Sequence, residues 1–178
     1  MSFKYSLFTV LFFIVLICFL VYFLFFYNSY RKKDVNEVAQ ILGLSEVSIL
    51  SSDYSFDPFT IQDYDLMEVY QLSYNSVHDF MLHSSFKLHD KFCASNSITS
   101  LAKKDWHKSP IDSIKWQETL SMVLGLRENE KRNKWLAEMR GILFSDYGYY
   151  ALYFTDKEIA FYVLDTMSGK LYISYLNP

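Results

Sequence analysis

The chain of 178 residues has few of the residues that interrupt or cross-link a fold: five glycines, three prolines and two cysteines. This composition excludes a collagen-like, a disordered and a disulfide-stapled protein, because each of those classes needs a compositional bias that is absent here. Cys93 is the only cysteine outside the N-terminal apolar segment. The rest of the chain therefore cannot form an internal disulfide.

Several common catalytic and nucleotide-binding motifs are also missing. Glycine occurs only at positions 43, 125, 141, 148 and 169, which excludes G-x-G-x-x-G, G-x-x-x-x-G-K-[ST] and G-x-S-x-G. The sequence has no C-x-x-C and no H-E-x-x-H. We therefore expect no cofactor, and no catalytic residue is singled out.

The chain does contain one long apolar run. Residues 6–27, SLFTVLFFIVLICFLVYFLFFY, form a 22-residue stretch without a charge. As a helix it would be roughly 33 Å long, which matches a bilayer core of ~30 Å. A cleaved signal peptide is shorter and is followed by small residues, whereas this run ends in Phe25, Phe26 and Tyr27. We expect an uncleaved, single-pass membrane anchor within residues 1–33, and hence localisation at a cell membrane.

The charges beside this run give opposing signals for its orientation. Lys4 precedes it, and Arg31, Lys32 and Lys33 follow it. The positive-inside rule favours a cytoplasmic C-terminal domain by about one charge. Uncleaved N-terminal signals, however, commonly export the domain that follows them. The sequence does not choose between the two sides.

Residues 34–178 are expected to fold as one α+β domain, which is long enough to bury a sizeable core. Apart from Lys4, the chain has 16 basic and 20 acidic side chains. Nucleic acid is excluded as a partner, because beyond the membrane flank no basic face is visible. The hydrophobic periods predict helices at 34–42, 76–86, 113–124 and 129–143, and strands at 46–52, 66–73, 149–155, 159–165 and 171–176.

The order of these elements favours an antiparallel sheet packed against helices. The last three strands should form a meander, with a turn at Ser168 and Gly169 between the final two. Residues 90–112 show no clear period and contain Pro110, so a loop with a helical turn is expected there.

An expected loop at residues 51–65, SSDYSFDPFTIQDYD, interleaves carboxylates with aromatic rings. Aromatic side chains supply contact area at protein interfaces, and carboxylates steer a basic partner. The alternative is that the rings enter the core and the aspartates are merely solvated. The candidate partner-binding residues are Asp53, Tyr54, Phe56, Asp57, Phe59, Asp63, Tyr64 and Asp65.

The four histidines, His78, His83, His89 and His107, fall within 30 residues of one another, with Cys93 among them. On a helical turn His89 and Cys93 would share a face, as a zinc or copper site could use. The alternative, which we favour, is that the histidines lie on the surface and Cys93 is a small buried apolar group.

These features predict a membrane-anchored, non-enzymatic domain that binds a protein partner, such as an immunity-type protein or an accessory subunit of an envelope complex. The alternative is an anchored metal-dependent hydrolase that uses the region from His78 to His107.

Overall fold

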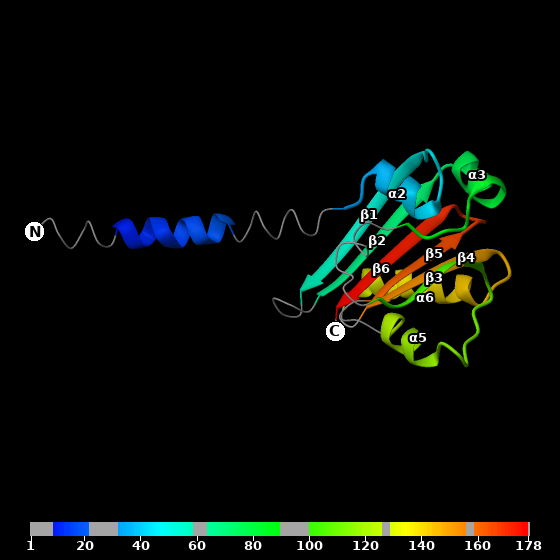
Figure 1. The fold of residues 1–178 in the computed structure, drawn as a ribbon. Coiled ribbons are helices and arrows are strands. Elements are labelled where there is room, and N and C mark those ends of the chain that lie inside the picture. The colour runs from blue at the N-terminus through cyan, green and yellow to red at the C-terminus, as the bar shows by residue number, and fades with distance from the viewer. Residues whose placement is uncertain are drawn as a thin grey trace, which may run out of the picture. The chain divides into compact units, whose positions relative to one another are not determined.

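The computed structural model describes residues 9–21, 32–58, 64–89, 100–125, 129–155 and 159–177 (Figure 1). The chain divides into two compact units, Met1–Lys33 and Asp34–Pro178. The second unit is α+β, as the sequence predicts. Its helices are α2 (Val35–Leu42), α3 (Tyr74–His83), α5 (Gln117–Val123) and α6 (Glu130–Leu143). Its strands are β1 (Ile49–Pro58), β2 (Tyr64–Leu72), β3 (Ser100–Lys108), β4 (Gly148–Thr155), β5 (Ile159–Asp165) and β6 (Lys170–Asn177).

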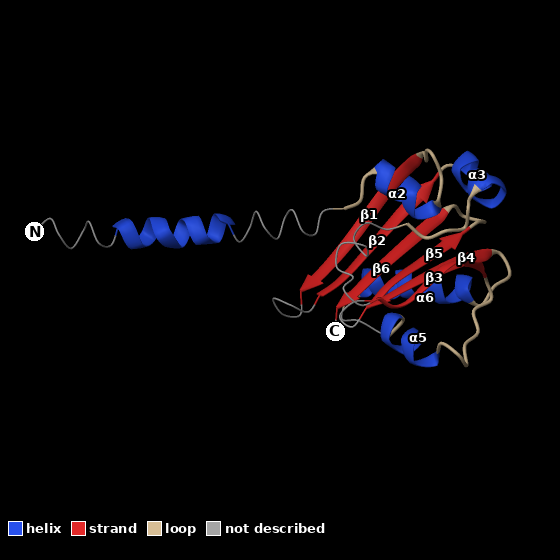
Figure 2. Cartoon of the chain, viewed as in Figure 1, coloured by secondary structure: helices blue, strands red, loops and turns tan. Residues whose placement is uncertain are grey.

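All six strands join one antiparallel sheet in the order β1-β2-β6-β5-β4-β3. The expected meander is confirmed, because β4, β5 and β6 are consecutive neighbours. β2 pairs with β6, so that β6 and β5 lie at the centre of the sheet, with β1 at one edge and β3 at the other (Figure 2).

The first helix of the domain, α2, has strong local signals at both ends. The Asp34 carboxylate accepts a hydrogen bond from the Glu37 backbone N–H at 2.9 Å, and the Glu37 carboxylate accepts one from the Asp34 N–H at 2.9 Å. This reciprocal capping box satisfies amide groups that the helix itself cannot. Gly43 ends the helix at φ 69°, a left-handed conformation that glycine adopts without steric cost.

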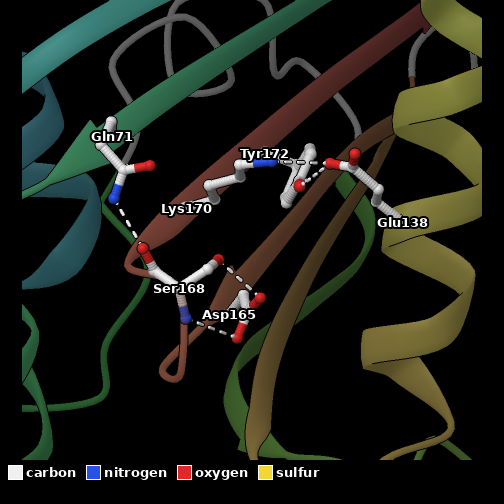
Figure 3. Close-up of polar contacts among 6 residues, drawn as sticks. All are labelled: Gln71, Glu138, Asp165, Ser168, Lys170 and Tyr172. Carbon is white, nitrogen blue, oxygen red and sulfur yellow. Dashed lines mark hydrogen bonds and ion pairs between the residues drawn. The ribbon is translucent and has the colours of Figure 1, made fainter.

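The turn between β5 and β6 is held by its own side chains. Asp165 accepts hydrogen bonds from the backbone N–H groups of Met167 at 2.8 Å and Ser168 at 3.2 Å. Gln71 of β2 donates to the Ser168 carbonyl at 2.6 Å (Figure 3). Gly169 has φ 73°, as the predicted turn requires. The meander is thus tied to β2 at this turn.

The sheet is covered on both faces. On one face, α5 and α6 contribute to a hydrophobic cluster with side chains of β4, β5 and β6, among them Leu152, Phe161 and Tyr172. On the other face, the Phe80 ring of α3 contacts Trp106 and Tyr149 at centroid distances of 5.3 and 5.2 Å. Both faces of β5 are therefore buried, and the tyrosines of the meander belong to the core rather than to a contact surface.

Several boundaries differ from the sequence expectation, among them the start of β1 at Ile49 rather than residue 46, the end of α3 at His83 rather than residue 86, and the start of α5 at Gln117 rather than residue 113. Residues 51–58 are strand rather than loop, and residues 100–108, expected within a loop, form β3. The helix α3 begins at Tyr74 with Ser73 as its cap, whereas the sequence analysis expected this helix to begin at residue 76. Ser76 instead lies inside α3, where its hydroxyl accepts a hydrogen bond from the Ser48 N–H at 2.8 Å.

In the first unit, residues 9–21 are helical and their side chains are exposed. The rest of the expected span, residues 6–8 and 22–27, lies outside the described residues. Among the helices in the described ranges, none combines the length and the apolar composition that crossing a bilayer requires.

Candidate functional site

The expected acidic and aromatic loop is mostly an edge hairpin formed by β1 and β2. Its register pairs Asp53 with Val69, Tyr54 with Glu68, and Phe56 with Leu66. Successive residues of a strand point to opposite faces, so Asp53 lies on one face of β1 and Tyr54 and Phe56 lie on the other. Whether these candidate residues bind a partner stays a prediction.

Asp53 lies on the α6 side of the hairpin. Its carboxylate forms an ion pair with Lys131 of α6 at 2.7 Å, and both side chains are about half exposed. The carboxylate also accepts a hydrogen bond from the Tyr54 backbone N–H at 2.9 Å. The Tyr54 side chain is 52% exposed and lies on the opposite face of the strand.

Asp65, expected in the partner surface, is instead a buried structural group. It is 5% exposed, and its carboxylate lies 3.3 Å from the guanidinium of Arg132. A buried carboxylate is costly unless a cation compensates it, and Arg132 supplies that cation. Asp65 is therefore unavailable to a partner.

Arg132 connects α6 to both strands of the hairpin. Its guanidinium donates to the Ser55 hydroxyl and to the Ser55 carbonyl, each at 3.0 Å, and also to the Asp65 carbonyl. The side chain is 1% exposed and is the largest fully buried side chain of the described residues. This arginine fixes the edge hairpin against the helix behind it.

Arg132 was not among the candidates selected from the sequence, although the sequence contains a signal for its buried position. The buried positions of α6 follow a helical period, and Arg132 falls on that face one turn before Trp135 and Leu136. A basic residue on the apolar face of a helix needs a buried acidic or carbonyl partner.

The other candidates of the hairpin are only partly described. Phe56 is partly buried on the Tyr54 face of β1. Asp57 and Tyr64 lie in β1 and β2, whereas Phe59 and Asp63 lie outside the described residues.

The histidines are not gathered into a site by the described part of the fold. His78 and His83 lie on α3, His89 follows that helix, and His107 lies on β3; all four are exposed. His78 stacks on Tyr74 with a centroid distance of 6.0 Å. Within the described ranges no three His, Cys, Asp or Glu side chains are placed to hold a metal ion, and Cys93 lies outside those ranges.

A second polar cluster joins α6 to β6 (Figure 3). Lys170 donates to the Glu138 carboxylate at 3.0 Å, and the buried Tyr172 hydroxyl donates to the same oxygen. Burial opposes ionisation of Glu138, but the hydrogen bonds from Tyr172 and Lys170 and the charges of Lys170 and Lys134 outweigh it and lower the pKa of Glu138. Burial and the bond to Glu138 raise the pKa of Tyr172. Tyr172 therefore keeps its proton, and the cluster is suited to holding the helix rather than to nucleophilic chemistry.

No protein family model, curated protein or solved structure matches this chain.

Proposed function

We propose that this protein is a non-enzymatic protein-binding domain, held at a membrane by an N-terminal helix. An immunity-type protein or an accessory subunit of an envelope complex would act in this way. The proposal needs no cofactor, metal or nucleic acid. The domain would bind its partner with the β1 side of the sheet.

The observation that carries the proposal is the rigid edge hairpin. β1 presents Asp53 and Tyr54 to solvent, while Arg132 fixes the same strand from behind. A surface that is already ordered loses little conformational entropy when it binds, so more of the contact energy appears as affinity. The exposed Tyr54 ring lies on one face of this edge strand and the Asp53–Lys131 ion pair lies on the other, and aromatic and charged side chains of these kinds are common at protein interfaces.

The partner surface can be tested with the full chain. Replacing Tyr54 by alanine should reduce recovery of the native partner by about tenfold, because the ring supplies buried contact area at an interface. The measurement is quantitative mass spectrometry of proteins that copurify with the tagged chain from gently solubilised membranes. The matched control is Tyr74→Ala, which removes a tyrosine that is 79% exposed on α3.

Two results would count against this surface. Equal losses for Tyr54→Ala and Tyr74→Ala would show that the hairpin is not the specific contact. Recovery of the lone chain under several mild solubilisation conditions would contradict a protein-binding role altogether.

The anchor is part of the proposal and has its own test. Residues 6–27 would span the bilayer, with Lys4 before them and Arg31, Lys32 and Lys33 after them. The full chain should stay in the membrane pellet after alkaline carbonate extraction, whereas a chain that begins at Lys32 should be released. Release of both chains would show that the N-terminal segment does not anchor the protein.

A further inference from the structure

The two edges of the sheet differ in how they discourage pairing with a further strand. The sequence of β3 contains Lys103, Lys104 and Lys108, and its register shifts twice against β4. Edge lysines and bulges are common devices that keep an edge from pairing with another chain. β3 therefore has the features of a guarded edge.

β1 lacks most of these devices. It contains no lysine, and after one shift near Ile49 its ladder with β2 runs in continuous register from Ser51 to Pro58. Two features discourage pairing: Pro58 at its end, and Asp53, whose carboxylate covers the Tyr54 N–H. A long, regular strand at the rim of a sheet is the template that strand addition uses.

The charge of this side of the domain indicates which partner would fit. Residues 34–77 contain eight acidic side chains and no lysine, arginine or histidine; Asp65 and Glu68 are buried, whereas Asp34, Glu46 and Asp53 are exposed. Residues 78–178 contain thirteen basic and twelve acidic side chains and are nearly neutral. The acidic segment forms α2, β1 and β2, which lie together on one side of the domain in Figure 1. A partner of opposite charge associates faster with such a surface, whereas a partner of the same charge is repelled by it.

We propose that β1 binds an extended, lysine- or arginine-rich segment of the partner protein, which adds to the six-stranded sheet as a further strand. This inference rests on the proposed function and names its binding mode. A basic side chain of the incoming strand pairs with Asp53, whose carboxylate turns away from the Tyr54 N–H and frees that donor for the new strand. Pairing of β1 with β1 of a second copy is disfavoured, because it would bring two acidic segments together.

The test uses the full chain in mild detergent and a displayed library of random peptides of about ten residues, which is the length of a long strand. Selected peptides should be rich in lysine and arginine, and their affinity should fall steeply with added salt. Amide hydrogen exchange of residues 51–58 should slow when such a peptide binds. Selection of neutral peptides, or unchanged exchange in β1, would overturn the proposal.

Backbone and side-chain contributions can be separated at one position. Tyr54→Ala keeps the N–H, whereas Tyr54→Pro removes it; this N–H bonds to the Asp53 side chain, so the folded sheet can spare it. Tyr54→Pro should lower the affinity for the selected peptides by about tenfold more than Tyr54→Ala does, because only the proline variant loses one main-chain hydrogen bond to the peptide. Equal affinities of the two variants would show that binding uses side chains alone.

A charge test remains informative if Tyr54→Pro does not fold. Asp53→Lys should lower the affinity for the selected peptides by at least about tenfold. Lys131→Gln, which removes the present ion-pair partner of Asp53, should not lower it. Equal losses in both variants would indicate that the ion pair only supports the hairpin, and would reject the proposed contact. Oligomers of the chain alone that disappear in Asp53→Lys would assign the edge to a second copy instead.

These outcomes are distinct from failure of the proposed function. The peptide selection needs no native partner, so it can fail while copurification still depends on Tyr54. In that case the hairpin would bind a partner by another mode.

Discussion

Replacing Arg132 by methionine should lower the free energy of unfolding by about 3–5 kcal/mol, the usual cost of removing one partner of a buried ion pair. The variant leaves the Asp65 carboxylate buried without its cation, and it removes donors to Ser55 and to the Asp65 carbonyl. Urea unfolding followed by circular dichroism measures this difference.

The neighbouring residue provides a matched control. Lys131→Met breaks an exposed ion pair on the same helix and should cost less than about 1 kcal/mol. The double variant Arg132→Met with Asp65→Leu should recover at least half of the lost stability, because it also removes the uncompensated charge. A cost for Arg132→Met no larger than that of the control would contradict the anchoring role.

Arg132→Met should also loosen the edge strand β1 more than the rest of the sheet. Arg132 ties β1 and β2 to α6 through Ser55 and Asp65, and these contacts span 77 and 67 residues of sequence. Amide hydrogen exchange in residues 51–58 should therefore accelerate more than exchange in β5. If the proposed function is correct, partner recovery should fall with it.

The second large effect is expected at Glu138. Replacing Glu138 by leucine should cost about 1–3 kcal/mol near neutral pH, because it leaves the hydroxyl of Tyr172, a residue that is 1% exposed, without its acceptor. Lys170 loses its ion-pair partner as well, but it is partly exposed and water can replace much of that interaction. Thermal or urea unfolding measures the change.

The pH dependence of this effect follows from the direction of the pKa shift. The pKa of Glu138 lies below its ordinary value of 4.5, so its contribution to stability is fully present above pH 4.5 and is lost as the pH falls through the lowered pKa. The pKa of Tyr172 is raised above its ordinary value of 10.0, so its contribution is present below pH 10 and is lost above it.

Glu138→Gln provides the control for this pH dependence. It keeps an acceptor for Tyr172 but cannot ionise, so its stability difference from the wild type should shrink as the pH is lowered from 4.5. A difference that does not change across the acid range would contradict the role of the ionised carboxylate.

The elements that were predicted correctly carry their signals within a few residues. α2 has Asp34, Glu37 and Gly43 at its ends, and the buried strands of the meander are continuous apolar runs separated by short turns. Caps, turns and periodic apolar residues act over one or two turns of chain, so a short window of sequence is sufficient to recognise them.

The sequence analysis missed β3 and most of β1, of which only residues 49–52 were predicted as strand, for a shared reason. β1 is rich in serine and aspartate, and β3 contains Lys103, Lys104 and Asp105. An edge strand borders water, so its composition approaches that of a loop, and polar residues that favour turns also occur there. Neither strand can be recognised in full without knowing the strand beside it.

The candidate site, too, could be predicted from the sequence only in part. Asp53 and Tyr54 were candidates from the sequence alone, and the structure exposes both side chains; that they bind a partner stays a prediction. The burial of Asp65 could not be predicted, because it depends on Arg132, which lies 67 residues further along the chain.

The sequence by itself determined a scarcity of glycine, proline and cysteine, a long apolar N-terminal run, the α+β class and the C-terminal meander. Only the tertiary structure decided that β1 is an edge, that Asp65 is an internal counter-ion and that Glu138 holds α6 to β6. The physical reason is the range of the interactions. Helix caps and hydrophobic periods are set by neighbours in sequence, whereas strand order and buried ion pairs depend on groups that only the completed fold brings together.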